Sequence, residues 1–173
     1  IDKFKGDLTR LKLEINEKYN VDVKIFEVDL EDEYARERLV KTLEEKIEFL
    51  NCLINNAAFV GTANLKGWAV EFEDQSLDTW RRAFEVNLTS CFHIIKSTKK
   101  LLEKSSHASI INIGSIYGLY GPDLSIYEGT DMNNPAAYSA SKGGLLQLSR
   151  WMSTVLAPQI RVNSISPGGI LRG

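Results

Sequence analysis

The stretch FLNCLINNAA, residues 49–58, indicates what kind of sheet this chain forms. Its first six residues are a short and mostly apolar run, which is typical of a strand buried on both faces of a parallel sheet. Two asparagines and two alanines follow at once. In open α/β sheets, ligands bind beyond the carboxyl ends of the strands. The stretch therefore predicts a central strand whose end faces a binding site.

Helix-like and strand-like segments alternate on both sides of this stretch. Apolar residues spaced among charges predict helices at residues 2–19, 31–48, 77–103 and 137–156. Runs rich in β-branched residues predict further strands at 21–28, 109–113 and 160–165. This alternation is typical of an α/β fold with a parallel sheet. The length fits one domain, so we expect residues 1–173 to form a single domain.

Polar or glycine-containing residues follow each predicted strand. They are Asp29, Asn55-Asn56, Ser115 and Pro167-Gly168. Since the carboxyl ends of parallel strands meet at one edge of a sheet, we expect these residues to border a common site.

The overall composition excludes several classes of function. Net charge is −2, and 43% of the residues are hydrophobic, so neither nucleic acid nor an anionic membrane is an expected partner. No apolar run reaches about 18 residues, which argues against a transmembrane helix. Cys52 and Cys91 lie inside apolar runs and lack metal-site spacing. We expect both to be buried thiols of a cytoplasmic protein, without a metal.

A candidate proton-transfer pair lies near the start of the last predicted helix, in Tyr138-Ser139-Ala140-Ser141-Lys142. Residues four apart share a helix face. At about 5 Å and an effective dielectric constant of about 20, an ammonium stabilises a tyrosine anion by roughly 3 kcal/mol. Tyr138 would thereby become more useful for proton transfer. An exposed helix pair without chemistry is the alternative.

Taken in order along the chain, the motifs resemble those of the classical short-chain dehydrogenases/reductases. These motifs are Asn55-Asn56-Ala57-Ala58, Asn87, Ser115, Tyr138 with Lys142, and Pro167-Gly168. The resemblance implies a Rossmann-like, doubly wound parallel sheet in a three-layer α/β/α arrangement. It also implies an oxidoreductase that transfers a hydride between NAD or NADP and a carbonyl or secondary alcohol.

The resemblance further implies a role for individual residues. Tyr138 would be the general acid/base, and Ser115 would hold the substrate oxygen beside it. Lys142 would bind the nicotinamide ribose, and Asn87, at a local break in its helix, would hold a relay water. Cofactor contacts would come from ten residues: Asp29, Leu30, Asn56, Ala57, Ala58, Tyr138, Lys142, Pro167, Gly168 and Ile170. Without the family context, Asp29 could instead cap the following helix, and Asn112 has a structural hydrogen-bonding role.

The chain departs from the family pattern in several places. The family's glycine-rich phosphate loop, its first two strands and its last strand have no counterpart in residues 1–173. We therefore expect this chain to be part of a longer one. Ala58 stands where glycine is usual, and Arg172 stands where threonine is usual. More residues than usual separate Ser115 from Tyr138.

The additional residues, around 123–135, are expected to form a loop on the substrate side. They are rich in Asp, Glu, Asn, Ser, Thr and Tyr, which suits a hydroxylated, sugar-like small molecule. Pieces of this region resemble members linked to bacterial sugar and flagellin-glycan biosynthesis. Trp68, Tyr117, Tyr120 and Tyr127 are candidates to line the substrate pocket, although loop aromatic residues also serve as packing.

Helix 137–156 carries apolar residues on more than one face, so one of its faces needs a partner. The family pairs this helix and the one that carries Asn87 with a second subunit. We therefore predict a homodimer or homotetramer through helices 77–103 and 137–156. Two other functions stay open: a sugar-nucleotide epimerase or dehydratase, and a non-catalytic Rossmann-fold binding protein. The sequence does not decide between NAD and NADP.

Overall fold

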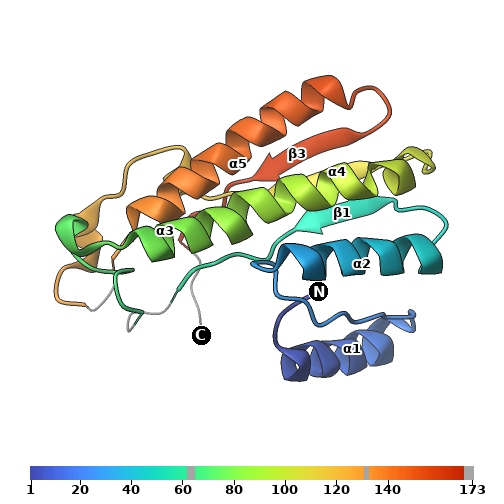
Figure 1. Cartoon of the computed structure of the whole chain (residues 1–173), viewed down its shortest axis with the longest axis horizontal. Helices are drawn as coiled ribbons and strands as arrows, with labels where there is room; N and C mark the ends of the chain where they lie inside the picture. The colour runs from blue at the N-terminus through green and yellow to red at the C-terminus, as the bar shows by residue number, and fades with distance from the viewer. Residues whose placement is uncertain (62–64, 131–132, 170–173) are drawn as a thin grey trace.

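The computed structural model describes residues 1–61, 65–130 and 133–169 (Figure 1). Its main elements in chain order are α1 (Lys5–Tyr19), α2 (Glu33–Lys46), β1 (Cys52–Asn55), α3 (Leu77–Phe84), α4 (Ser90–Glu103), β2 (Ser109–Ile113), α5 (Ala136–Val155) and β3 (Arg161–Ile165). A π-helical turn, η2 (Glu85–Thr89), joins α3 to α4. The four predicted helices therefore all form, and the third contains a local break.

The three strands form a parallel sheet in the order β1-β2-β3. The chain returns from β1 to β2 through α3 and α4, and from β2 to β3 through α5. The register places Asn55 opposite Asn112, and Asn112 opposite Ser164. The carboxyl ends of the strands therefore lie at one edge, as the sequence predicted for an α/β fold.

The strand predicted at residues 21–28 is wrong. This segment pairs only through an isolated bridge between Asp2 and Glu27 within the described residues, and the Val28 amide donates to the Asp2 carbonyl at 2.9 Å. A strand needs a neighbouring strand to satisfy its backbone donors and acceptors. Its β-branched composition favours an extended backbone, but it does not supply that neighbour.

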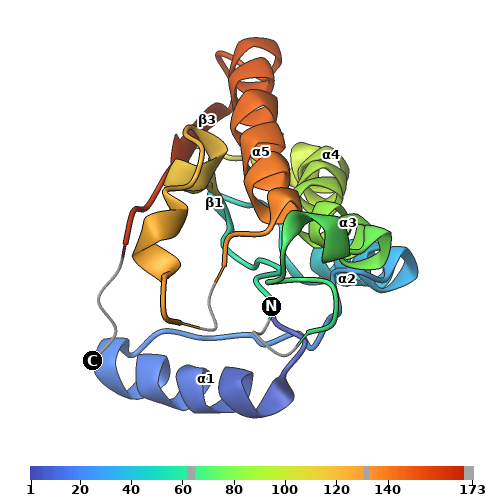
Figure 2. The ribbon, with the colours of Figure 1, turned by 90° about the vertical axis from the view of Figure 1, so that its left-hand side faces the viewer.

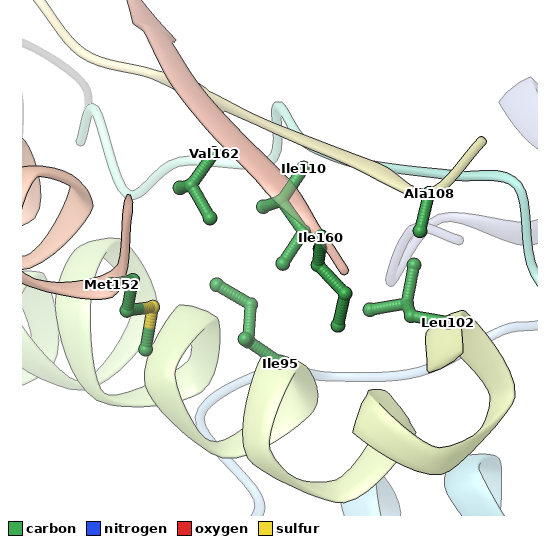
Figure 3. Packing of buried hydrophobic residues seen from close by; sticks show 7 residues of the cluster. All are labelled: Ile95, Leu102, Ala108, Ile110, Met152, Ile160 and Val162. Carbon is green, nitrogen blue, oxygen red and sulfur yellow. The ribbon is translucent and has the colours of Figure 1, made fainter. Parts of the chain in front are cut away.

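The core lies between one face of the sheet and helices α4 and α5 (Figure 3). Figure 3 shows Ile95 and Leu102 pointing from α4 toward Ile110 and Ile160. These four side chains are at most 2% exposed. Burying a side chain of this size stabilises a fold by roughly 1.5–3 kcal/mol. The contacts fix α4 and α5 on the sheet and so determine where their functional side chains lie.

The opposite face of the sheet is open in the described part of the chain. Successive strand residues point to opposite faces. Leu53 packs on the core, whereas its neighbours Cys52 and Ile54 are exposed. The prediction that β1 is buried on both faces is therefore wrong, and so is the burial predicted for Cys52. Cys91 is buried, as expected.

Helix α1 lies apart from the layer of α3, α4 and α5 (Figure 2). Leu8 is its one buried side chain among those described. Helix α2 packs against α4, and its N-cap is Asp32, whose side chain accepts from the Ala35 amide at 3.1 Å. Asp29 is therefore not the cap of this helix.

Candidate active site

A buried pair of asparagines joins the ends of β1 and β2. Asn55 Nδ2 donates to Asn112 Oδ1 at 2.7 Å, and Asn112 Nδ2 donates to Ser149 Oγ on α5 at 2.8 Å. Asn112 is 0% exposed. A buried amide is costly unless it is hydrogen-bonded, and these partners satisfy both ends of the Asn112 side chain. The structural role predicted for Asn112 is confirmed, and its bonds tie both strands to α5.

Asn87 lies in the π-helical turn η2, at the helix break that the sequence predicted. π-Bulges inside α-helices are frequent at functional sites. Its Oδ1 accepts from the Phe59 amide at 2.7 Å, and its Nδ2 donates to the Phe59 carbonyl at 3.3 Å and to Ser141 Oγ at 3.0 Å. Both amide hydrogens are therefore used to tie the loop after β1 to α5. A relay water would have to bind an oxygen of Asn87.

Tyr138 and Lys142 lie near the start of α5, four residues apart. Lys142 is 3% exposed; its Nζ donates to the Ile113 carbonyl at 2.7 Å and lies 5.9 Å from the centroid of the Tyr138 ring. Burial lowers the pKa of Lys142 below its ordinary value. The alternative of an exposed helix pair is therefore wrong, because the ammonium is buried beside the end of β2.

Ser115 is buried directly beyond β2, and its Oγ accepts from the Tyr117 amide at 3.2 Å. The segment that follows lies tightly against α5. A Cβ atom on Gly118 would lie 2.8 Å from the carbonyl carbon of Lys142 and 2.9 Å from the backbone nitrogen of Gly143. Glycine permits this approach, which holds the residues after Ser115 against the turn of α5 that carries Lys142.

Five of the ten residues predicted to bind the cofactor line two neighbouring cavities. One, of about 150 Å³, is lined by Asp29, Leu30, Ala57 and Ala58, among others. The other, of about 270 Å³, is lined by Leu30, Asn56 and Ala57, and also by Cys91. The two cavities share Asp2, Leu30 and Ala57. The five predicted contacts come from the ends of the 21–28 segment and of β1, and the fold brings them together.

The segment after β3 lies beside Ser115. The Ile116 amide donates to the Pro167 carbonyl at 3.1 Å. A Cβ atom on Gly168 would lie 3.9 Å from the Ile116 side chain. Pro167 and Gly168 are thus near the predicted catalytic residues. Ile170 and Arg172 lie outside the described residues.

Two arginines hold the turn that follows residue 28, and the sequence analysis missed both. Arg82 Nε and Nη2 donate to the two carboxylate oxygens of Glu31 at 2.9 and 3.0 Å. Arg36 is 1% exposed, with its Nη2 2.7 Å from Glu85 Oε1, and it also donates to the Leu30 carbonyl and to His93 Nδ1.

Helical spacing could have found Arg36. It lies three and four residues before Leu39 and Val40, so it belongs to the buried face of α2. Its bonds connect the Leu30 turn, at the cofactor side, to the first residue of the π-helical turn that carries Asn87.

In the part of the chain that the structure describes, no cluster of three or more His, Cys, Asp or Glu side chains could hold a metal ion. The same residues contain no helix with the length and apolarity needed to cross a membrane.

A parallel α/β sheet with Ser, Tyr and Lys side chains gathered at one edge defines a Rossmann-like protein of the dehydrogenase type. Residues 1–172 match the family model of the short chain dehydrogenases. The chain belongs to this family.

Relatives and solved structures agree with this assignment. The chain is 32% identical, over 93% of its length, to trans-4-hydroxycyclohexanecarboxylate dehydrogenase of Sinomonas cyclohexanicum, covering 56% of that protein. It is 30% identical, over 91% of its length, to post-translational flagellin modification protein A of Campylobacter coli, covering 66%. It matches the structure of an NAD+-bound xylitol dehydrogenase with a TM-score of 0.82 and 28% identity, covering 99% of this chain and 60% of that one. The chain spans about half to two thirds of the length of its curated relatives.

Proposed function

We propose that the protein is an NAD(P)-dependent oxidoreductase that transfers a hydride between nicotinamide and a carbonyl or secondary alcohol carbon. The observation that carries the proposal is the burial of the Lys142 ammonium beside Tyr138, at 3% exposure. Burying a charge is expensive. A protein that only binds a ligand has no use for a buried ammonium beside a tyrosine ring, whereas a proton-transfer site does.

The residues divide the chemistry between them. The cofactor supplies or accepts the hydride. Tyr138 gives a proton to the carbonyl oxygen in reduction and takes one from the alcohol in oxidation. Ser115 donates a hydrogen bond to the same oxygen and so orients it. Lys142 places its ammonium 5.9 Å from the centroid of the Tyr138 ring, where it would bind the nicotinamide ribose.

The two cavities fit a dinucleotide in their chemistry. Asp29 offers a carboxylate whose Oδ1 accepts from the Glu31 amide at 2.9 Å, while Asp32 caps α2. The small side chains of Ala57 and Ala58 leave room for a flat ring. We assign the adenine end to Asp29, Leu30 and Ala57, and the nicotinamide end to Tyr138, Lys142 and Pro167. NAD and NADP remain alternatives.

We further propose a homodimer or homotetramer through helices 77–103 and 137–156. An apolar groove of about 500 Å³ runs between α4 and α5 and includes Leu88, Phe92, Leu148 and Trp151. Phe92 and Trp151 are 43% and 57% exposed. Exposed patches of large apolar residues mark interaction sites. A size measurement that finds only monomer would contradict this assembly.

We also propose a cytoplasmic location, because Cys52 and Cys91 are free thiols and the cytoplasm is reducing.

Cofactor titration of the full-length protein tests the proposed function. A ligand that binds the native state at 100 times its Kd stabilises it by about 2.7 kcal/mol. We expect NADH or NADPH to raise the melting temperature in a saturable way, with one of them effective at lower concentration. No shift with either at saturating concentration would contradict the proposal and favour a fold-only relative.

A further inference from the structure

Arg82 contacts both of the chain segments that line the smaller cofactor cavity, of about 150 Å³. One segment is the turn after residue 28, which includes Asp29 and Glu31, and the other is the stretch after β1, which includes Phe59. The Arg82 guanidinium donates to the two carboxylate oxygens of Glu31 at 2.9 and 3.0 Å. Its Cζ atom lies 4.8 Å from the centroid of the Phe59 ring. One side chain of α3 therefore connects the two segments.

Both contacts of Arg82 restrict geometry. A bidentate arginine–carboxylate pair sets the orientation of the two groups as well as their distance, and this pair is partly buried, with Arg82 34% and Glu31 25% exposed. Phe59 is fixed in turn. Its ring packs edge-to-face on Trp68 with 4.9 Å between the ring centroids, and its amide donates to Asn87 Oδ1 at 2.7 Å. The side chain of Glu31 is therefore attached to a well-anchored part of the molecule.

The backbone of Glu31 extends this constraint to Asp29. The Glu31 amide donates to Asp29 Oδ1 at 2.9 Å, so the position of Glu31 orients the Asp29 carboxylate. An ionised carboxylate accepts at both of its oxygens. The Oδ1 atom is held within the turn, and the Oδ2 atom can accept from a ligand in the cavity that Asp29 lines. The exocyclic amino group of an adenine ring is a donor of the kind that this oxygen requires.

We propose that Arg82 is a positioning residue for cofactor recognition: through Glu31, it orients the Asp29 carboxylate toward the amino group of the adenine ring. The inference rests on the proposed function, because it deepens the assignment of the adenine end to this cavity. A site built to hydrogen-bond a donor discriminates against an analogue that lacks the donor, because its polar group is then left unpaired. The protein should therefore prefer an adenine dinucleotide to its hypoxanthine analogue, which has an oxygen in place of the amino group.

The competing explanation is that the pair of Arg82 and Glu31 only stabilises the protein. A purely structural pair would change the affinity for both dinucleotides by the same factor. The test is therefore a ratio of Kd values, measured by fluorescence titration of the full-length protein. The probes are NADH and reduced nicotinamide hypoxanthine dinucleotide, or their 2′-phosphates if NADPH binds more tightly than NADH. The variants are Arg82→Met and Glu31→Ala, and Arg81→Met is the matched control, since Arg81 is an exposed residue of the same helix.

We expect the unmodified protein and Arg81→Met to bind the adenine probe about tenfold more tightly, as for one hydrogen bond to a charged group. Arg82→Met and Glu31→Ala should lower this preference to about threefold or less, chiefly by weakening the binding of the adenine probe. Glu31→Ala tests the proposal even if Arg82→Met does not fold, because the partly exposed Arg82 can then be hydrated. Equal losses on both probes, or no preference for adenine before mutation, would overturn the proposal.

Two outcomes separate this inference from the proposed function. If the protein binds NADH or NADPH but the variants do not change the ratio of the two Kd values, the oxidoreductase stands and the role of Arg82 is wrong. If it binds neither NADH nor NADPH, the proposed function itself fails, and the inference fails with it.

Discussion

Side-chain burial differs between the helical layer of α3, α4 and α5 and the N-terminal helix α1. Asn87, in the turn that joins α3 to α4, and Asn112, in β2 under α5, are 0% exposed and hydrogen-bonded at both ends of their side chains. Helix α1 leaves Leu11 and Leu13 50% and 65% exposed. The layer therefore supports its polar side chains with its own contacts, whereas the described residues cover little of α1.

This difference explains which part of the site is fixed most firmly. Tyr138 and Lys142 lie on α5, which packs on the core of the sheet and is hydrogen-bonded to β2 through Asn112 and through Lys142 and the Ile113 carbonyl. Ser115 directly follows β2. The turn at Asp29 and Leu30 lies between the two regions, and Arg36 and Arg82 attach it to the layer. Changes in the layer should therefore affect stability and catalysis together, and changes in α1 should affect neither.

The largest expected loss of stability is that of Asn87→Leu. This substitution leaves the Phe59 amide and carbonyl without the hydrogen-bond partners that Asn87 provides. Each buried polar group without a partner costs about 1–3 kcal/mol, so we expect stability to fall by about 3 kcal/mol. The control is Asn16→Leu in α1, because the Asn16 Oδ1 atom is buried without a partner among the described residues. That change leaves no backbone group without a partner, so it should not lower stability. Urea unfolding of the full-length protein measures both, and equal losses would contradict the contrast.

Arg36→Met should cost about 2 kcal/mol. Removing one partner of a buried ion pair costs 3–5 kcal/mol, but Glu85 is 34% exposed and recovers part of its hydration. The variant should also weaken cofactor binding, because Arg36 holds the Leu30 turn. Arg38→Met is the control on the same helix, since Arg38 is 70% exposed and its ion pair is 3.7 Å long. Unchanged cofactor affinity in Arg36→Met would show that the Leu30 turn does not depend on this arginine.

Gly118→Ala should cost about 1–2 kcal/mol, a cost typical of overpacking. Because the added Cβ would push the segment after Ser115 away from α5, kcat should fall as well. Gly121→Ala provides the control: a Cβ there meets nothing within 4 Å. Steady-state kinetics and thermal unfolding distinguish the two variants. If both alanines behave alike, the close approach at Gly118 has no consequence for the site.

Leu13→Ser should have the smallest effect, below about 0.5 kcal/mol, as for other exposed positions. Thermal unfolding of the full-length protein checks this. A loss above about 1 kcal/mol would mean that residues beyond those described cover α1 in the whole protein, and the contrast between the two regions would not extend to it.

Local patterns predicted more of this molecule than nonlocal ones did. The helices followed from apolar spacing, and Ser76, a residue type favoured at N-caps, accepts from the Thr79 amide at the start of α3. The 21–28 strand was wrong because strand formation depends on a partner elsewhere in the chain. The prediction that Cys52 is buried was wrong, because an apolar run does not show which of its residues face the covered side of a sheet.

The candidate site divides in the same way. Ser115, Tyr138 and Lys142 could be named because their residue types and order carry the family pattern. Gly118 and Arg36 were missed because their importance lies in contacts with α5, η2 and the Leu30 turn. The resemblance predicted the break at Asn87, but only the structure shows that the Asn87 amide is used for Phe59 and Ser141.

The most direct test of the account is the rate of nicotinamide reduction by the full-length protein and by Tyr138→Phe, with a cyclic secondary alcohol as substrate. The phenylalanine keeps the ring beside Lys142 but removes the hydroxyl that would transfer the proton. General acid–base groups contribute about 10²–10⁴-fold. We predict a loss of kcat in that range with the melting temperature unchanged. A Tyr138→Phe variant that reduces the cofactor as fast as the unmodified protein would contradict the account.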